Sequence, residues 1–193
     1  IARLQIPDAG CGITVSTLAE ARFFQKAGFD DITFAFPITP NKLAQAAELT
    51  TLTKHFHILL DQLATVAAVE AYGRNNNVCF SVFLKVDCGY HRAGVDPFAP
   101  ESVQLAQQIQ ASRYIVFRGI LTHAGHSYHC RNPEEIIAIA RQERDVMGEF
   151  ADRLKQHGVA CETISVGSTP TAIHAPGWQG VSEIRPGNYA FFD

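Results

Sequence analysis

The sequence has no apolar stretch near the roughly 18 residues that a membrane-spanning helix needs. It has no strong charge excess either, because 16 lysines and arginines stand against 19 acidic residues. The formal net charge of −3 therefore indicates neither a nucleic-acid partner nor an acidic membrane surface. No secretory signal pattern opens the chain.

The sequence has only five cysteines, and their spacing does not suggest disulfide pairs. The number is odd, the spacing is wide and no Cys-x-x-Cys pair occurs, which argues against a disulfide framework. We therefore expect a reducing compartment and a cytoplasmic protein, with most cysteines acting as small buried apolar residues. The five are Cys11, Cys79, Cys88, Cys130 and Cys161.

The length of 193 residues favours a single domain with a substantial core. A hydrophobic fraction of 47% and a charged fraction of 18% are typical of a soluble globular protein. The sequence lacks an initiator methionine and opens abruptly at Ile1. We expect residues of the natural protein before Ile1 and after Asp193.

Apolar runs rich in Val, Ile, Phe and Thr alternate along the chain with amphipathic stretches. Nearly continuous apolar runs of this length are typical of strands that are buried on both faces. The predicted strands are Gly12–Val15, Asp31–Phe36, Phe56–Leu60, Cys79–Val86, Phe117–Thr122, Cys161–Val166 and Glu183–Arg185. The predicted helices are Thr17–Ala27 with Ser16 as its N-cap, Pro40–Thr53, Gln62–Asn75, Pro100–Ala111 and Pro133–His157.

This alternation predicts an α/β fold with a parallel sheet. No Gly-x-Gly-x-x-Gly follows the first strand, which weakens the doubly wound dinucleotide-binding alternative. Polar clusters instead follow several different strands, as in a (β/α)8 TIM-type barrel that builds its site from loops at the carboxyl ends. Seven strands are one short of eight, so we expect the first strand to precede Ile1.

The first polar cluster runs from Lys85 to Gly94. Lys85 and Asp87 alternate around an apolar residue and therefore face the same side of their strand, which is the interior in a barrel. Arg92, in the following turn, can pair with an acid or an anion. A structural ion-pair network is the competing interpretation of the same residues.

The second cluster holds three histidines and a tyrosine within eight residues, including His123, His126 and Tyr128. An imidazole here can stack on a planar cofactor, and a tyrosine or histidine can move protons. The spacing fits no standard zinc motif, so we predict no metal ligands here. Solvated loop histidines are the plainer alternative, and His129 fits it better than His123 does.

The third and fourth clusters have the composition of a phosphate cradle. Gly167 permits a close backbone approach, and Ser168 and Thr169 offer hydroxyl and amide donors, although a plain helix cap explains them too. The fourth cluster, residues 183–189, is again rich in glycine and hydrogen-bond donors. In these barrels, phosphate sites often follow strands seven and eight, which are the places that these two clusters would take.

Five phrases, in order, resemble the fold-type III pyridoxal-phosphate enzymes. The resemblance is strongest to the D-serine dehydratase and D-threonine aldolase family, related to the N-terminal domain of alanine racemase. It covers nearly the whole chain, so the domain expected is an incomplete cofactor-binding barrel over residues 1–193 with no second domain. The phrases are GITVSTLAEA, KVDCGYHRAGV, GILTHAGHSY, SVGSTPT and EIRPGNYAFFD.

The resemblance implies roles for individual residues. His123 would pack against the cofactor ring, Tyr128 would be an active-site tyrosine, and Arg185 would lie beside the pyridine nitrogen. Catalysis would then rest on Tyr128 and His123. The cradle that holds the phosphate would consist of Gly167, Ser168, Thr169, Gly187, Asn188 and Tyr189. A supporting polar network beside it would consist of Lys85, Asp87 and Arg92.

Two family features are absent from the sequence. The family's Schiff-base lysine stands in a Pro-His-x-Lys-Thr-His phrase, and its metal pair, His-x-Cys or His-x-Asp, lies in a C-terminal β-domain; neither occurs here. The resemblance thus implies pyridoxal phosphate, and zinc or manganese bound by ligands outside this chain. We expect the 193 residues alone to be inactive.

The expected activity of the full-length protein is a lyase reaction on D-3-hydroxy amino acids. D-Serine or D-threonine dehydration is favoured by the HAGHSY phrase, with D-threonine aldolase or amino-acid racemase as alternatives. A non-catalytic pyridoxal-phosphate-binding protein that acts in cofactor homeostasis is the alternative from another class. The resemblance implies a homodimer with a small-molecule substrate.

Overall fold

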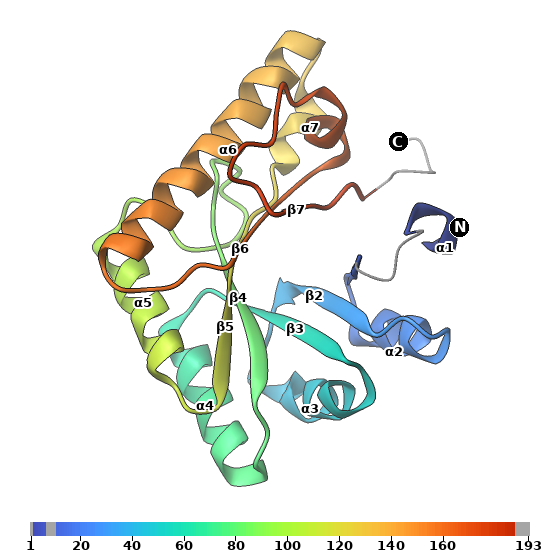
Figure 1. Ribbon diagram of the computed structural model, residues 1–193, viewed down its shortest axis with the longest axis vertical. Helices are drawn as coiled ribbons and strands as arrows, with labels where there is room; N and C mark the ends of the chain where they lie inside the picture. The colour runs from blue at the N-terminus through green and yellow to red at the C-terminus, as the bar shows by residue number, and fades with distance from the viewer. Residues whose placement is uncertain (1, 7–10, 188–193) are drawn as a thin grey trace. The chain divides into compact units, whose positions relative to one another are not determined.

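The computed structural model describes residues 2–6 and 11–187, and the chain divides into two compact units. The first unit contains residues 1–82 and 112–116, and the second contains residues 83–111 and 117–193. Helices and strands alternate along the chain in both units (Figure 1). Among the described helices, none is long and apolar enough to cross a membrane.

The first unit contains three strands that pair in parallel in chain order: β1 (Ile13–Val15), β2 (Asp31–Pro37) and β3 (His55–Leu60). Ile32, Phe34 and Ile58 are fully buried, as the apolar runs predicted. The helices of this unit are α1 (Ala2–Gln5), α2 (Leu18–Lys26), η1 (Pro40–Lys42), α3 (Leu43–Leu52) and α4 (Leu63–Asn76).

Two strands, β4 (Phe80–Lys85) and β5 (Ile115–Leu121), begin in the first unit and end in the second. In the second unit, β5 pairs in parallel with β6 (Thr163–Val166), and β6 pairs with β7 (Glu183–Ile184). The helices are α5 (Pro100–Ala111), η2 (Gly125–His129), α6 (Pro133–Gln156) and α7 (Thr169–His174). The short α7 lies beside the long α6 (Figure 1).

The strand order is β1-β2-β3-β4-β5-β6-β7, so every strand neighbours its successor in the chain. A doubly wound sheet reverses its order at a switch point, whereas a barrel does not. The predicted α/β fold of the TIM-barrel type is confirmed, and the described part of the chain supplies seven of its parallel strands. The strand expected before Ile1 lies outside this sequence.

Several predicted boundaries shift, and each shift has a local cause. The N-cap of α2 is Thr17, not Ser16: the Thr17 hydroxyl accepts from the Glu20 amide, and the Glu20 carboxylate accepts from the amides of Ser16 and Thr17. This capping box moves the helix start by one residue. Residues 40–53, predicted as one helix, form the 3-10 turn η1 followed by α3. Residues 125–129, predicted as loop, form the 3-10 helix η2.

Candidate functional site

The second unit brings together the carboxyl ends of β4, β5, β6 and β7. Lys85 ends β4, His123 follows β5, Gly167 follows β6 and Arg185 follows β7. Each of the four residues was predicted from a different polar cluster. Because the strands are parallel neighbours, their carboxyl ends share one edge, and the four residues lie there.

His123 is fixed by a hydrogen bond from its Nδ1 to the carbonyl of Gly167, at 2.8 Å. A carbonyl can only accept, so Nδ1 carries the proton and Nε2 keeps its lone pair in the neutral ring. Burial lowers the pKa of His123 from 6.5 to about 4, although the Gly167 bond acts to raise it. The ring is therefore neutral at physiological pH, with Nε2 as an acceptor.

Gly167 passes so close to Arg185 that no side chain fits between them. A Cβ at Gly167 would lie 2.7 Å from the Arg185 nitrogen, and the glycine has a φ of +145°. The Arg185 amide also donates to the Val166 carbonyl at 2.9 Å. The third and fourth predicted clusters thus meet, as parallel neighbours of β6 and β7 should.

The Arg185 guanidinium is held by groups from β6, from β7 and from Thr122, the residue after β5. Its Nε donates to Ser165 Oγ at 2.8 Å, it bonds the Thr122 carbonyl, and it lies 3.6 Å from a Glu183 carboxylate oxygen. Burial lowers its pKa, but a guanidinium stays protonated in proteins. A fixed positive charge therefore lies at this edge of the sheet.

Lys85 adds a second buried basic group, with 5% of its surface exposed. Burial, together with the positive charge of Arg185, lowers its pKa from 10.5 to about 7. Asp87 was predicted to face the same side of the strand as Lys85. Its carboxylate accepts from the amides of Gly89 and His91 and from the His91 ring, each at 2.9 Å, and so closes its own turn. Burial acts to raise the pKa of Asp87, but these hydrogen bonds outweigh it and hold the pKa below its ordinary value.

Arg92 lies over the ring of Tyr90, 5.2 Å from its centroid. The Tyr90 ring also contacts the His123 ring edge-on at 6.1 Å and stacks on His126 at 5.8 Å. It leaves no room for a Cβ at Gly125, which would lie 2.3 Å from it. Sequence reasoning missed Tyr90, although it stands within the KVDCGYHRAGV phrase; an aromatic residue in a polar turn was the available signal.

Ser168 serves as the N-cap of α7, and its side chain is bonded inside the protein. Its hydroxyl accepts from the Thr171 amide at 3.2 Å and lies 2.7 Å from the Ser127 hydroxyl. The Ser168 residue is only 1% exposed. The helix-cap alternative therefore describes the Ser168 side chain, which joins α7 to η2.

Tyr128 is 39% exposed, and its hydroxyl accepts from the Thr169 amide at 3.3 Å. The predicted tyrosine therefore lies against the predicted cradle. Gly187 is exposed, with no atom within 4 Å of where its Cβ would stand. Asn188 and Tyr189, also predicted for the cradle, lie outside the described residues.

The two neighbouring histidines differ from His123. His129 is exposed, as the solvated-loop alternative expected. Both ring nitrogens of His126 are buried without a hydrogen-bond partner in the described structure. Within residues 2–6 and 11–187, no group of three His, Cys, Asp or Glu side chains is arranged to hold a metal ion.

Glu143 is a site residue that sequence reasoning missed entirely. It stands on α6, is 1% exposed, and accepts from the Gly167 amide at 2.9 Å. A signal was available, because its spacing from Ala140, Met147 and Phe150 places a carboxylate on the apolar face of the helix.

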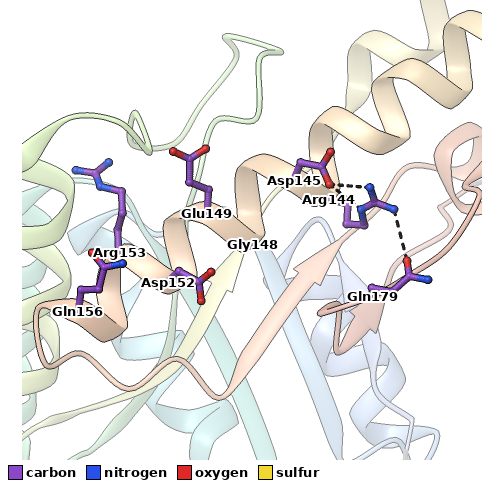
Figure 2. Close-up of a pocket in the computed structure, with 8 residues that line it drawn as sticks. All are labelled: Arg144, Asp145, Gly148, Glu149, Asp152, Arg153, Gln156 and Gln179. Carbon is purple, nitrogen blue, oxygen red and sulfur yellow. Dashed lines mark hydrogen bonds and ion pairs between the residues drawn. The ribbon is translucent and has the colours of Figure 1, made fainter.

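A groove on the outer side of α6 is separate from this site (Figure 2). None of the predicted site residues lines it. Arg144 bonds Asp145 and Gln179 there, as the dashed lines show, and Glu149 and Asp152 project beside them (Figure 2).

Sequentially ordered parallel strands define a barrel-type α/β protein. Its polar site at their carboxyl ends holds a neutral imidazole, a buried lysine and an arginine with a largely buried side chain. The family model of the alanine racemase N-terminal domain matches residues 3–193. The chain belongs to this family, and the resemblance found in the sequence is confirmed.

The relatives include enzymes of D-amino-acid metabolism. The chain is 41% identical to D-serine dehydratase of Dictyostelium discoideum, covering 94% of this chain and 49% of that protein. It is 29% identical to D-threonine aldolase of Arthrobacter sp., covering 100% of this chain and 51% of the relative. The chain thus spans about half the length of these curated relatives.

A solved structure agrees closely over the whole chain. D-threo-3-hydroxyaspartate dehydratase from Delftia sp. (strain HT23) superposes with a TM-score of 0.94 at 37% identity, covering 100% of this chain and 51% of that one. A variant of the same dehydratase, solved in a metal-free form, gives a TM-score of 0.92.

Proposed function

We propose that the complete gene product containing this chain is a pyridoxal-phosphate-dependent lyase that dehydrates D-3-hydroxy amino acids such as D-serine or D-threonine. One observation carries the proposal: a neutral His123 held by Gly167 beside Arg185, on a chain 41% identical to a D-serine dehydratase. Identities of 37% to a D-threo-3-hydroxyaspartate dehydratase and 29% to a D-threonine aldolase support the same substrate class.

The residues present fit the cofactor. Pyridoxal phosphate carries an anionic phosphate and a flat pyridine ring, so its site needs positive charge, a side chain that packs on the ring and backbone groups close to the phosphate. Arg185 would lie beside the ring nitrogen, and the neutral His123 would pack on the ring face. Gly167, whose amide is held by Glu143, would leave room for the phosphate because it has no side chain, and Thr169 would turn its amide from the Tyr128 hydroxyl to the phosphate. The Ser168 side chain would support this approach by capping α7 rather than by binding directly.

Bound pyridoxal phosphate supplies an electron sink that stabilises negative charge at the substrate Cα. The remaining work belongs to the chain. His123 stays neutral, with Nε2 left as an acceptor, so its ring adds no positive charge beside Arg185. Tyr128, an exposed residue whose hydroxyl accepts from the Thr169 amide, would donate a proton to the departing β-hydroxyl. Loss of the Cα proton and of this hydroxyl as water gives an unsaturated amine, and a second water hydrolyses the imine tautomer of that product to a 2-oxo acid and ammonia.

The proposal is tested with the complete gene product, reconstituted with pyridoxal phosphate. We expect visible absorption from a lysine-bound cofactor, and 2-oxo acid and ammonia from D-serine but not from L-serine. Tyr128→Phe should lower kcat by about 100-fold or more while the absorption persists. Tyr72→Phe on α4, in the first unit, is the matched control and should leave kcat unchanged.

Other outcomes would contradict this choice and select an alternative. Glycine and an aldehyde from D-threonine would identify an aldolase, and loss of optical activity from alanine a racemase. Cofactor binding without turnover of any of these would identify a cofactor-homeostasis protein. A reconstituted protein with no visible absorption would overturn pyridoxal phosphate itself.

Three further features belong to the same proposal. A divalent metal, zinc or manganese, would polarise the departing hydroxyl from ligands outside this chain, as the metal-free form of the related dehydratase suggests. Removing it with a chelator should abolish dehydration, and adding it back should restore it. The homodimer and the cytoplasmic location stay predictions.

A further inference from the structure

Glu143 is a carboxylate where helix α6 needs an apolar side chain. The residues that share its buried face are Ala140, Met147, Phe150 and Leu154, spaced as the core stripe of an amphipathic helix. Glu143 itself is 1% exposed. A buried carboxylate is costly unless hydrogen bonds satisfy it, so its presence at this position calls for a set of donors.

Those donors come from two segments of the candidate site. The Gly167 amide donates to Oε1 at 2.9 Å, and the Thr171 hydroxyl donates to Oε2 at 3.0 Å. The backbone of Ala124, between His123 and η2, is a further hydrogen-bonding neighbour. Burial raises the pKa of Glu143, and the Gly167 bond, the positive charge of Arg185 and the other two donors act to lower it. Among the described residues no ion pair involves Glu143, so its direct hydrogen bonds are with neutral groups, and Arg185 acts on it only through its charge.

The bond to Gly167 reaches His123 through a single residue. The Gly167 amide donates to Glu143, and the Gly167 carbonyl accepts from His123 Nδ1 at 2.8 Å. A glycine has many conformations available, and these two bonds, together with the close approach to the Arg185 backbone, select the one with a φ of +145°. The direction of the Gly167 carbonyl decides which nitrogen of His123 carries the proton.

We infer that Glu143 is a positioning residue: by holding the Gly167 backbone, it fixes the Nδ1-protonated tautomer of His123 and leaves Nε2 as the acceptor. The inference deepens the proposed function and rests on it for the role of His123. The positioning of His123 by Glu143 can be tested without the cofactor, because the hydrogen bonds that join Glu143, Gly167 and His123 all lie within the protein.

The test compares variants of the complete gene product without cofactor, using ¹⁵N NMR of the labelled His123 ring. Glu143→Asp keeps the charge but shortens the reach by one methylene, so we expect the Nδ1-protonated form to lose its dominance. Glu143→Gln keeps the length and can accept from Gly167, so it should restore the wild-type spectrum. Glu149→Asp is the matched control, because Glu149 is exposed on the outer side of the same helix (Figure 2).

Cofactor affinity is the second readout. Equilibrium dialysis should show about tenfold weaker pyridoxal phosphate binding for Glu143→Asp, as expected for one lost hydrogen bond to a charged group, and no change for Glu149→Asp. A folded Glu143→Asp protein with an unaltered His123 spectrum would overturn the inference. If the wild type binds no pyridoxal phosphate, the proposed function fails. The His123 spectra would still show whether Glu143 fixes the tautomer of His123.

A measurement on the unaltered protein covers the case in which Glu143→Asp does not fold. The Gly167 amide should be strongly protected from hydrogen exchange, because Glu143 accepts its hydrogen. The amide of the exposed Gly180 is the reference. Equal exchange rates at the two glycines would refute the role assigned to Glu143.

Discussion

Replacing Gly167 by alanine tests the contact on which the candidate site depends. The new Cβ would stand 2.7 Å from the Arg185 nitrogen and 2.8 Å from its carbonyl oxygen. Both atoms belong to the backbone, so no side-chain rotation can relieve the clash. The end of β6 must therefore move away from the segment after β7, and the Gly167 bonds to His123 and Glu143 move with it.

The magnitude follows from two additive costs. A non-glycine residue in a sparsely populated backbone region costs about 1–3 kcal/mol. Forcing an extra carbon into a packed site costs about 1–3 kcal/mol more. The free energy of unfolding should thus fall by at least about 2 kcal/mol, and cofactor affinity should fall as well because Arg185 is displaced.

Two other glycines of the second unit separate these costs. Gly158 has a φ of +79° with open space at its Cβ position, so Gly158→Ala carries the backbone cost alone. Gly148 lies within α6 with no atom within 4 Å of that position, so Gly148→Ala should stabilise the helix by about 0.5–1 kcal/mol. Urea unfolding should give the highest free energy of unfolding for Gly148→Ala, a lower one for Gly158→Ala and the lowest for Gly167→Ala. If Gly167→Ala costs no more than Gly158→Ala, the close approach of Gly167 to Arg185 is refuted.

Two further predictions concern pH. The pKa of His123 is lowered by burial from 6.5 to about 4, so the unfolded chain binds the proton more readily and stability should decline as pH falls through this window. Unfolding measurements from pH 7 to pH 4 should show a steeper loss for the wild type than for His123→Gln, and equal slopes would contradict the assignment. The pKa of Lys85 is lowered by burial from 10.5 to about 7, so wild-type stability should rise as pH increases across that interval. Lys85→Met should remove this rise and stabilise the protein at pH 6 while weakening cofactor binding; a variant less stable than wild type at pH 6 would show that the buried amine is not a net cost.

The sequence by itself determined the elements and their order. Short runs of three to eight residues, most of them apolar and alternating with amphipathic stretches, predicted the seven strands found among the described residues. Parallel strands then place their carboxyl ends at one edge, which is why His123, Gly167 and Arg185 could be assigned to one site. The positions of the strands and helices follow from local patterns, and the shared edge follows from the strand order. A single sequence is enough to predict each of them.

The hydrogen-bond partners within the site were decided only by tertiary structure. Asp87 faces its own turn, the Ser168 hydroxyl caps α7 and joins Ser127, and Glu143 reaches from α6 to Gly167, 24 residues away. Such pairings depend on the register between strands and on the rotation of a helix about its axis, to within about an ångström. The spacing of residues along the chain fixes which face a side chain occupies, but not which atom it meets there.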